Sequence, residues 1–453
     1  MNEKAADQSS LQIGIAEVDY TPEVGLDMIG NYRGDDYASR GVHDSLFARA
    51  IVATNAMGEK AAILSIDICW MSREPVEFLR NYIARETDIK PGNIMVHATH
   101  THSGPKSDLD APKAKEYLKK AAGAVIHANK NLAPTKLYAG RAAEDRVSFN
   151  RRLECIDGTT HMCWEKLEPG FVKGPLGPID PELITLSVER AGKPSGVLVN
   201  FACHSTTLTG NNWLYSADYP GYIAESLRRI KGEDYIPMFL NGCCGNVTQV
   251  DYEVGFIDTY QECQRIGYML GIAALEAINN QEPVSGDTVA VSARMVPLKH
   301  MTISEDRLNW AKKLKKKIDK EGMPPLQPDG LPDEEYAVKW LKMHETQDEV
   351  DKLEVMVIRI GDVAFVALPG EMFSEFGLDI KARSPFRNTI VMGITNDYAA
   401  YFPTLVSYTE GPEGFTPMIT GYETTPGTSR YEEGAGEKLA DSAVEQLIEL
   451  FNG

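Results

Sequence analysis

Three neighbouring stretches of sequence indicate the fold class: KAAILSIDICWM (residues 60–71), SREPVEFLRNYIARETDI (72–89) and NIMVHATHTHSGP (93–105). The first and third are short apolar runs typical of buried strands. The second carries apolar residues at helical spacing and begins at Ser72, a residue type that favours helix N-termini. Two strands joined through a helix form a βαβ unit with parallel strands. The stretch therefore predicts an α/β fold.

The same alternation continues along the chain. It predicts strands over 11–22, 46–55, 196–208 and 235–247, and helices over 111–130, 217–231 and 258–280. Residues 353–371 are typical of a hairpin that turns at Gly361-Asp362. A helix (373–384), a strand (389–398) and a closing helix (433–451) follow. The expected fold class is α/β, with a mixed, largely parallel central sheet flanked by helices.

Composition and charge limit the classes of partner. The 453 residues include 65 Asp plus Glu against 46 Lys plus Arg, which gives a net charge of −19. We expect no nucleic-acid partner and no attraction to anionic lipids, because both require a basic surface. No stretch reaches the length of an apolar membrane span, so no transmembrane segment is expected. The polar first ten residues show no export signal. Two locations remain as alternatives: the cytoplasm, or a periplasmic or secreted location after a signal has been trimmed.

The domain organisation is expected to be simple. The length permits about three domains, but no linker separates two compositions, so we expect a single domain over residues 11–453. The charged helical stretch 303–350, with a proline-rich loop at 324–335, breaks the rhythm of strands and helices and is expected to be a solvated insertion within that domain. The seven cysteines are too few for a disulfide scaffold and are expected to be mostly buried thiols.

Residues with catalytic potential follow four of the predicted strands. They are His100 and His102, His204, Glu371, and the pair Tyr398 and Tyr401. Ligands of open α/β sheets bind outside the carboxyl ends of the strands. His-x-His at a strand end can present two imidazoles to Zn²⁺, because alternate strand residues face the same side. From spacing alone, a zinc site and a polar strand end with solvated histidines both remain open.

These segments resemble the neutral, non-lysosomal ceramidase family, zinc-dependent amidases that cleave N-acyl sphingosine. ATHTHSGP (98–105) is similar to the family signature. The similarity continues in order through IGIAEVDYTP (13–22), GVHDSLFARA (41–50), NFACHSTTL (200–208), SADYPGY (216–222), LPGE (368–371), NDYAAYFPT (396–404) and GYETTPGTSRYEEGAGE (421–437). The similarity covers about residues 11 to 450 except 303–350. It implies that the chain has the fold of the family's catalytic α/β domain.

The resemblance also implies roles for individual residues. The zinc ligands would be His100, His204, Glu371 and Tyr401. His102 would lie beside the metal and transfer protons. This replaces the interpretation from spacing, in which His100 and His102 both bind the zinc ion. Arg151 would contact substrate, with Arg152 as the alternative register, and Tyr422 would donate a hydrogen bond to the oxyanion. Because a zinc ion with an open position lowers the pKa of its water to about 7, we expect a zinc-dependent amidohydrolase of a small acyl-amide or lipid-like substrate.

The chain departs from the family in two places. Thr248, within Gly245–Gln249, stands where the family has a serine, and Cys243-Cys244 before it offer a less favoured nucleophile or second metal site. No counterpart of the family's C-terminal β-sandwich domain is expected. An ester or lactone hydrolase with the same zinc site, and a lipid- or glycan-binding homologue without catalysis, remain alternatives.

Overall fold

The computed structural model describes residues 11–34, 36–193, 195–325, 332–409 and 420–453. The polar start (1–10) and part of the predicted loop 324–335 lie outside these ranges. The largest layer is a nine-stranded mixed sheet with the order β14-β12-β11-β6-β1-β3-β4-β5, and β16 pairs with β6. Its strands are β1 (Gln12–Asp19), β3 (Phe47–Thr54), β4 (Lys60–Ile66), β5 (Ile94–Ala98), β6 (Ala133–Ala143), β11 (Glu182–Arg190), β12 (Gly196–Phe201), β14 (Ile236–Asn241) and β16 (Glu282–Pro283).

A second sheet of four strands packs face to face on the first. Its order is β17-β18-β19-β21, formed by β17 (Val289–Lys299), β18 (Val350–Ile360), β19 (Val363–Ala367) and β21 (Asn388–Met392). Apolar side chains from both sheets, such as Ile15, Ile51, Ile358 and Phe365, form one buried cluster between them. Burial of this apolar area is the main force that holds the two sheets together.

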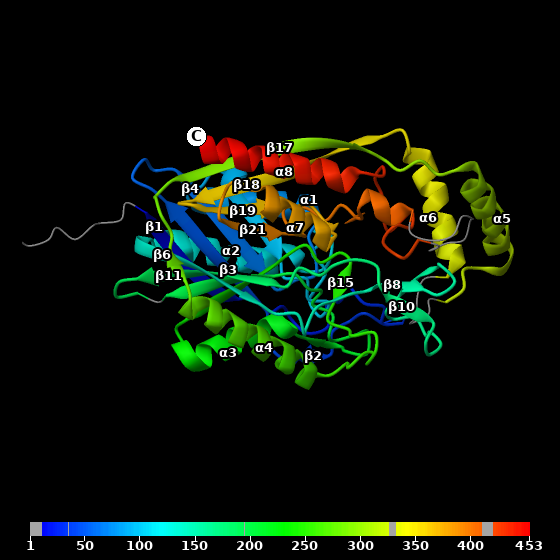
Figure 1. The fold of residues 1–453 in the computed structure, drawn as a ribbon, viewed down its shortest axis with the longest axis horizontal. Helices are drawn as coiled ribbons and strands as arrows, with labels where there is room; N and C mark the ends of the chain where they lie inside the picture. The colour runs from blue at the N-terminus through cyan, green and yellow to red at the C-terminus, as the bar shows by residue number, and fades with distance from the viewer. Residues whose placement is uncertain (1–10, 35, 194, 326–331, 410–419) are drawn as a thin grey trace, which may run out of the picture.

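Helices cover the outer face of each sheet. The nine-stranded sheet is covered by α1 (Arg73–Glu86), α2 (Ala114–Lys130), α3 (Tyr219–Lys231) and α4 (Tyr260–Asn279). The four-stranded sheet is covered by α7 (Ser374–Arg383) and α8 (Ala435–Asn452). Figure 1 shows α3 and α4 on the opposite side of the molecule from α8. The molecule is therefore built in four layers, helix–sheet–sheet–helix.

The α/β class and the mixed sheet are confirmed, but the prediction of a largely parallel sheet is wrong. Among the named strands of the nine-stranded sheet, parallel pairing joins β4 to β5 and β12 to β14, whereas the other pairs run antiparallel. Short connections such as 55–59 explain this, because they return the chain directly beside itself. Each sheet has helices on one face, because its other face packs against the other sheet.

The nine-stranded sheet bends where β1 meets β6. These two strands pair over two residue pairs, Gln12 with Pro134 and Ile13 with Ala133. The edge strand β14 then lies close to β4 and β5: Ser65 Oγ donates to the Phe239 carbonyl at 2.8 Å, and the Asn241 amide lies 2.9 Å from His97 Nε2. The bend brings the carboxyl ends of β5 and β12 together, although the two strands are far apart in the pairing order.

The described residues within 303–350 form two helices, α5 (Glu305–Glu321) and α6 (Asp333–Thr346), which lie at one end of the long axis in Figure 1. They pack on each other through a small core around Ala311 and Trp340. The indole of Trp340 donates to the carbonyl of Pro426 at 2.7 Å, which ties α6 to the segment 421–429.

Short elements complete the fold. They are β2 (Gly41–Val42) with β13 (Leu214–Tyr215), β7 (Phe149–Asn150) with β15 (Val247–Thr248), the sheet of β8 (Arg152–Cys155), β9 (Thr160–Met162) and β10 (Val172–Pro175), β20 (Glu371–Met372) with β22 (Tyr401–Phe402), and the 3₁₀ turns η1 (Pro91–Asn93) and η2 (Leu405–Tyr408). None of the described helices combines the length and apolar composition that crossing a bilayer requires.

Candidate active site

A cavity of about 780 Å³ lies beyond the ends of β5 and β12, beside the β20–β22 pair. Its wall contains six of the seven residues that the sequence analysis assigned to a site: His102, Arg151, His204, Glu371, Tyr401 and Tyr422. The seventh, His100, lies behind Glu371, with its Nε2 3.6 Å from Glu371 Oε2. Residues from four strand ends thus meet at one place.

His100 and His204 are held in the same way by backbone carbonyls. The Nδ1 of His100 lies 2.8 Å from the carbonyl oxygen of Cys69, and the Nδ1 of His204 lies 2.7 Å from that of Cys244. A carbonyl only accepts hydrogen bonds, so each Nδ1 carries a proton, which leaves Nε2 as the nitrogen of each ring that can bind a metal. Burial lowers the pKa of His204 to about 4, so this ring is neutral at pH 7. This is the arrangement that metal-binding histidines adopt.

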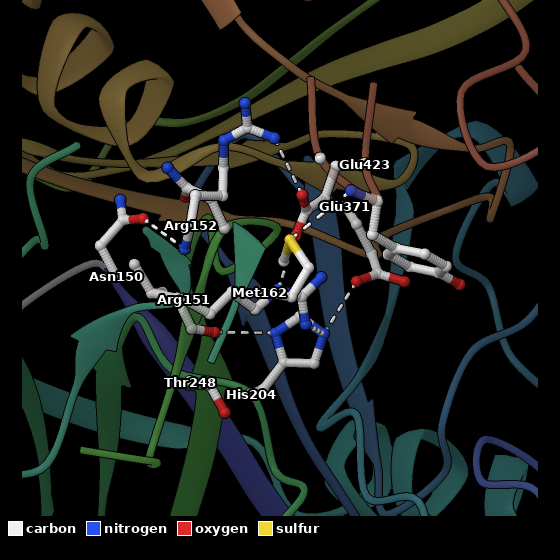
Figure 2. Close-up of polar contacts among 12 residues, drawn as sticks. Asn150, Arg151, Arg152, Met162, His204, Thr248, Glu371 and Glu423 are labelled. Carbon is white, nitrogen blue, oxygen red and sulfur yellow. Dashed lines mark hydrogen bonds and ion pairs between the residues drawn. The ribbon is translucent and has the colours of Figure 1, made fainter. Parts of the chain in front are cut away.

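Nε2 of His204 faces a carboxylate oxygen, as Figure 2 shows. Nε2 of His204 lies 2.9 Å from Glu371 Oε2, a buried oxygen without a hydrogen-bond partner among the described residues. Two lone pairs at this distance repel each other unless a cation lies between them. Two imidazoles and a carboxylate are ligands that Zn²⁺ prefers, so this donor set fits a metal ion.

Tyr401 lies beside this set because β20 and β22 pair in parallel with Glu371 opposite Tyr401. Two thiols lie close as well. Cys69 with His100 and His102, and Cys244 with His100 and His204, also form groups with the spacing of metal ligands. Burial raises the pKa of both thiols well above its usual range, so they are protonated in the metal-free chain.

His102 reaches the site by a different route from the predicted one. Strand β5 ends at Ala98, and His100 has a φ of +71°, in the left-handed region, so strand alternation does not align the two histidines. Nε2 of His102 still lies 3.4 Å from Nε2 of His100, while its Nδ1 lies 3.2 Å from Asn31 Oδ1. The prediction that the two rings lie together is confirmed, and the reason given for it is wrong.

The second oxygen of Glu371 is bound by a tyrosine to which the sequence analysis assigned no role. The hydroxyl of Tyr398 donates to Glu371 Oε1 at 2.9 Å. The Tyr398 ring stacks on Trp70, with 4.6 Å between centroids and an angle of 16°. Tyr398 therefore orients the carboxylate; its place with Tyr401 after the apolar run of β21 (Asn388–Met392) was the signal that singled it out, without a task.

The structure separates the two adjacent arginines. Arg151 lines the cavity, with Nη1 3.2 Å from His204 Nε2, whereas the Arg152 side chain is buried and donates to the carbonyl of Thr420. Both guanidinium groups bind one buried carboxylate, Glu423, at 2.7 and 3.0 Å (Figure 2). Glu423 was missed from the sequence, although it directly follows Tyr422. Arg151 is thus the arginine that can meet a ligand.

Tyr422 and Thr248 complete the polar wall. The Tyr422 ring meets Tyr401 edge to face at 5.7 Å, and burial raises the pKa of its phenol to about 12, so Tyr422 stays a hydrogen-bond donor at neutral pH. Thr248 lines the cavity and its hydroxyl donates to Gln249. Aromatic side chains form much of the remaining wall: Tyr32, Trp70, Trp164, Trp213, Phe256 and Tyr336. The cavity thus joins a compact polar centre to aromatic walls, which suits a molecule with an apolar part.

Comparison with known proteins identifies the family. Residues 11–239 match the family described as neutral/alkaline non-lysosomal ceramidase, N-terminal, and the chain belongs to that family. The neutral ceramidase of Pseudomonas aeruginosa is 28% identical over 236 residues, which are 48% of this chain and 33% of the relative. Neutral ceramidase A of Dictyostelium discoideum is 25% identical over 236 residues, 48% of this chain and 32% of the relative. These alignments span about a third of the curated relatives.

Solved structures show the same fold. The crystal structure of neutral ceramidase from Pseudomonas aeruginosa superposes with a TM-score of 0.72 at 21% identity, over 98% of this chain and 75% of that one. A ceramidase complexed with C2 gives a TM-score of 0.73 at 20% identity, over 98% and 76% of the two chains. The four-layer arrangement is therefore the fold of this family.

Proposed function

We propose that the protein is a zinc-dependent hydrolase that cleaves the amide bond of an N-acyl lipid such as ceramide. The observation that carries the proposal is the approach of His204 Nε2 to Glu371 Oε2 at 2.9 Å, with His100 Nε2 at 3.6 Å from the same oxygen. All three groups are buried. Membership of the ceramidase family supports an amide as the bond that is cleaved.

The proposed metal ligands are His100, His204, Glu371 and Tyr401. A bound zinc ion would supply a Lewis acid and a hydroxide nucleophile at neutral pH. The remaining steps belong to side chains of this chain. Tyr422, protonated at neutral pH, donates a hydrogen bond to the oxygen that becomes negative as the carbonyl is attacked, a contribution of about 3–4 kcal/mol in other enzymes.

Arg151 and His102 have different tasks in this proposal. Arg151 keeps its charge at the cavity wall because Glu423 binds its Nε. Its Nη2 has no hydrogen-bond partner in the part of the chain that the structure describes, and we assign it to the acyl group of a substrate. His102 is neutral, because burial lowers its pKa well below the usual range. Its Nε2 carries the free lone pair, since its Nδ1 donates to Asn31 Oδ1, and it therefore can move a proton from water to the leaving amine.

Metal content tests the ligand set. Purified protein should hold close to one zinc per chain, and His100→Ala or His204→Ala should each lose most of it. His127→Ala, an exposed histidine on α2, is the control and should keep its zinc. Stoichiometric zinc in both of the first two variants would overturn the assignment.

Hydrolysis tests the reaction. The zinc-loaded protein should cleave N-acyl sphingosines or N-acyl amino acids faster than simple esters, and a chelator should abolish the activity. Turnover of esters or lactones alone would replace the amidase proposal with the esterase alternative. Binding of acyl amides without turnover of any substrate, in zinc-replete protein, would favour a binding protein.

A further inference from the structure

Arg33 is a charged residue of the cavity wall that the proposed function does not use. It is 5% exposed and lines the cavity described above. Each nitrogen of its guanidinium group donates to a backbone carbonyl: Nε to Asn212 at 2.9 Å, Nη1 to Asn31 at 3.3 Å and Nη2 to His102 at 2.7 Å. The group is therefore fixed where three segments of the wall meet.

The charge of Arg33 is unusual because no described carboxylate balances it. Arginine stays protonated in proteins, and a buried charge is normally paired with an opposite one. The partners of Arg33 within the described ranges are the three carbonyls alone. Burial lowers the pKa of Arg33, and the groups that oppose this shift, Cys69 and Tyr37, include no carboxylate. Asp36, close by in the sequence, pairs with Arg40 at 3.1 Å instead.

The cavity as a whole is positively charged. Among the Asp, Glu, Lys and Arg residues that the structure describes, three line it: Arg33, Arg151 and Glu371. A metal ion bound to Glu371 would offset its negative charge, and Arg151 shares its counter-charge, Glu423, with Arg152. The chain itself has a net charge of −19. A cleft lined by one sign of charge concentrates ligands of the opposite sign, so this cavity favours an anionic group.

The two arginines of the wall lie beside different histidines. Nη1 of Arg151 is 3.2 Å from Nε2 of His204, and the proposed function assigns this arginine to the acyl group. Arg33 donates to the backbone of His102, the residue proposed to pass a proton to the leaving amine. A negative group attracted by Arg33 therefore belongs to the amine portion of an acyl amide.

We propose that the charge of Arg33 makes the site selective for acyl amides whose amine portion carries a carboxylate, as in N-acyl amino acids, over uncharged amides such as N-acyl sphingosines. The inference rests on the proposed function and names a substrate class for the same site. The attraction requires no contact between the guanidinium group and the ligand, because the energy of two charges falls only as the inverse of their separation.

The test compares two ligands that differ in one charge. N-dodecylsulfonylglycine carries a carboxylate, and N-dodecylsulfonylglycinamide is its uncharged counterpart. Each has a sulfonamide in place of the amide, so that neither is turned over. Isothermal titration of the zinc-loaded full chain should show about 10-fold tighter binding of the carboxylate, the order expected for opposite charges about 10 Å apart at an effective dielectric constant of about 20.

Three variants separate the charge of Arg33 from its structural role. Arg33→Gln removes the charge and should lower the preference for the carboxylate about 10-fold, with zinc content unchanged. Arg33→Lys keeps the charge but cannot make the same three hydrogen bonds, so it should melt lower and keep most of the preference. Arg85→Gln, at an exposed position of α1 outside the cavity wall, changes the net charge equally and should keep both affinities.

The proposal is overturned if the wild type does not bind the carboxylate more tightly than the uncharged ligand. It is also overturned if Arg33→Gln keeps the preference, since the metal or Arg151 would then hold the carboxylate, or if Arg33→Lys loses as much of it. If Arg33→Gln does not fold, Arg33→Met, which keeps an apolar stem, is measured in its place. Hydrolysis is read separately: a preference that depends on Arg33, without turnover of N-acyl amino acids, would remove the hydrolase proposal and leave the selectivity standing.

Discussion

Replacement of Gly30 by alanine tests the position of His102 without touching a proposed metal ligand. Gly30 lines the cavity with a φ of +109°, and a Cβ built on it would lie 2.6 Å from Cγ and Nδ1 of the His102 ring. Ordinary van der Waals contact begins near 3.4 Å, so the ring has to withdraw by about 0.8 Å. It cannot do so freely, because its two nitrogens lie against Asn31 and His100.

The expected loss for Gly30→Ala is about 100-fold in kcat, the usual effect of moving a reacting group by about 1 Å. Gly25→Ala is the matched control, because Gly25 has a φ of +101° and no atom within 4 Å of its built Cβ. Both variants force an L side chain into left-handed backbone, at about 1–2 kcal/mol, so both should melt lower while Gly25→Ala keeps its kcat.

The assay is amide hydrolysis with zinc content and melting temperature measured on the same samples. Equal kcat values for Gly30→Ala and Gly25→Ala, with equal zinc, would refute the proton-transfer role of His102. Loss of zinc in Gly30→Ala alone would contradict the placement of His102 outside the set of metal ligands.

Two further substitutions test buried and surface charge. Glu423→Gln removes the carboxylate that both buried guanidinium groups bind and should cost about 3 kcal/mol of unfolding free energy in urea, whereas the exposed Glu449→Gln should cost less than about 1 kcal/mol; equal losses would contradict the buried-pair argument. Burial raises the pKa of Asp351, but hydrogen bonds from His300 and Tyr431 outweigh it and hold the pKa below its ordinary value. A lowered pKa stabilises the folded state above the unfolded pKa of about 3.9. The loss of unfolding free energy in Asp351→Asn should therefore be complete at pH 6 and should shrink as the pH falls below about 4. A loss that grows on acidification would contradict this.

Local sequence patterns were sufficient to predict most elements around the site. The strands before His100, His204 and Glu371 are short apolar runs that end in polar, Gly or Pro residues, and signals of this kind depend only on neighbouring residues. Because ligands gather at strand ends, these three residues could be selected before their distances were known. Arg151 and Tyr422 follow no such rule, and only the family resemblance singled them out.

The stacking of two sheets could not be predicted from those patterns. Strand β6 alternates buried with exposed or half-buried residues over its first seven positions, and β17 has half-buried or exposed residues between its buried positions Val289 and Leu298, so that no continuous apolar run marks either strand in the sequence. Their partners are also distant: β17 pairs with β18 across the whole 303–350 segment. Strand pairing of this kind is decided by tertiary packing, which local composition does not record.

Long-range hydrogen bonds, which no motif records, set the exact position of His100. Strand β5 is bound by Asn396, whose Oδ1 accepts from the Val96 amide across 300 residues of sequence, at 2.8 Å. The Asn396 amide group donates in turn to Glu354 at 2.8 Å. His100, Ile394 and Asn396 all have positive φ, a costly conformation for residues other than glycine that persists where surrounding contacts impose it. The sequence of the THTHSGP motif alone therefore does not set the position of His100 beside Glu371, which also depends on contacts of the chain around residue 396.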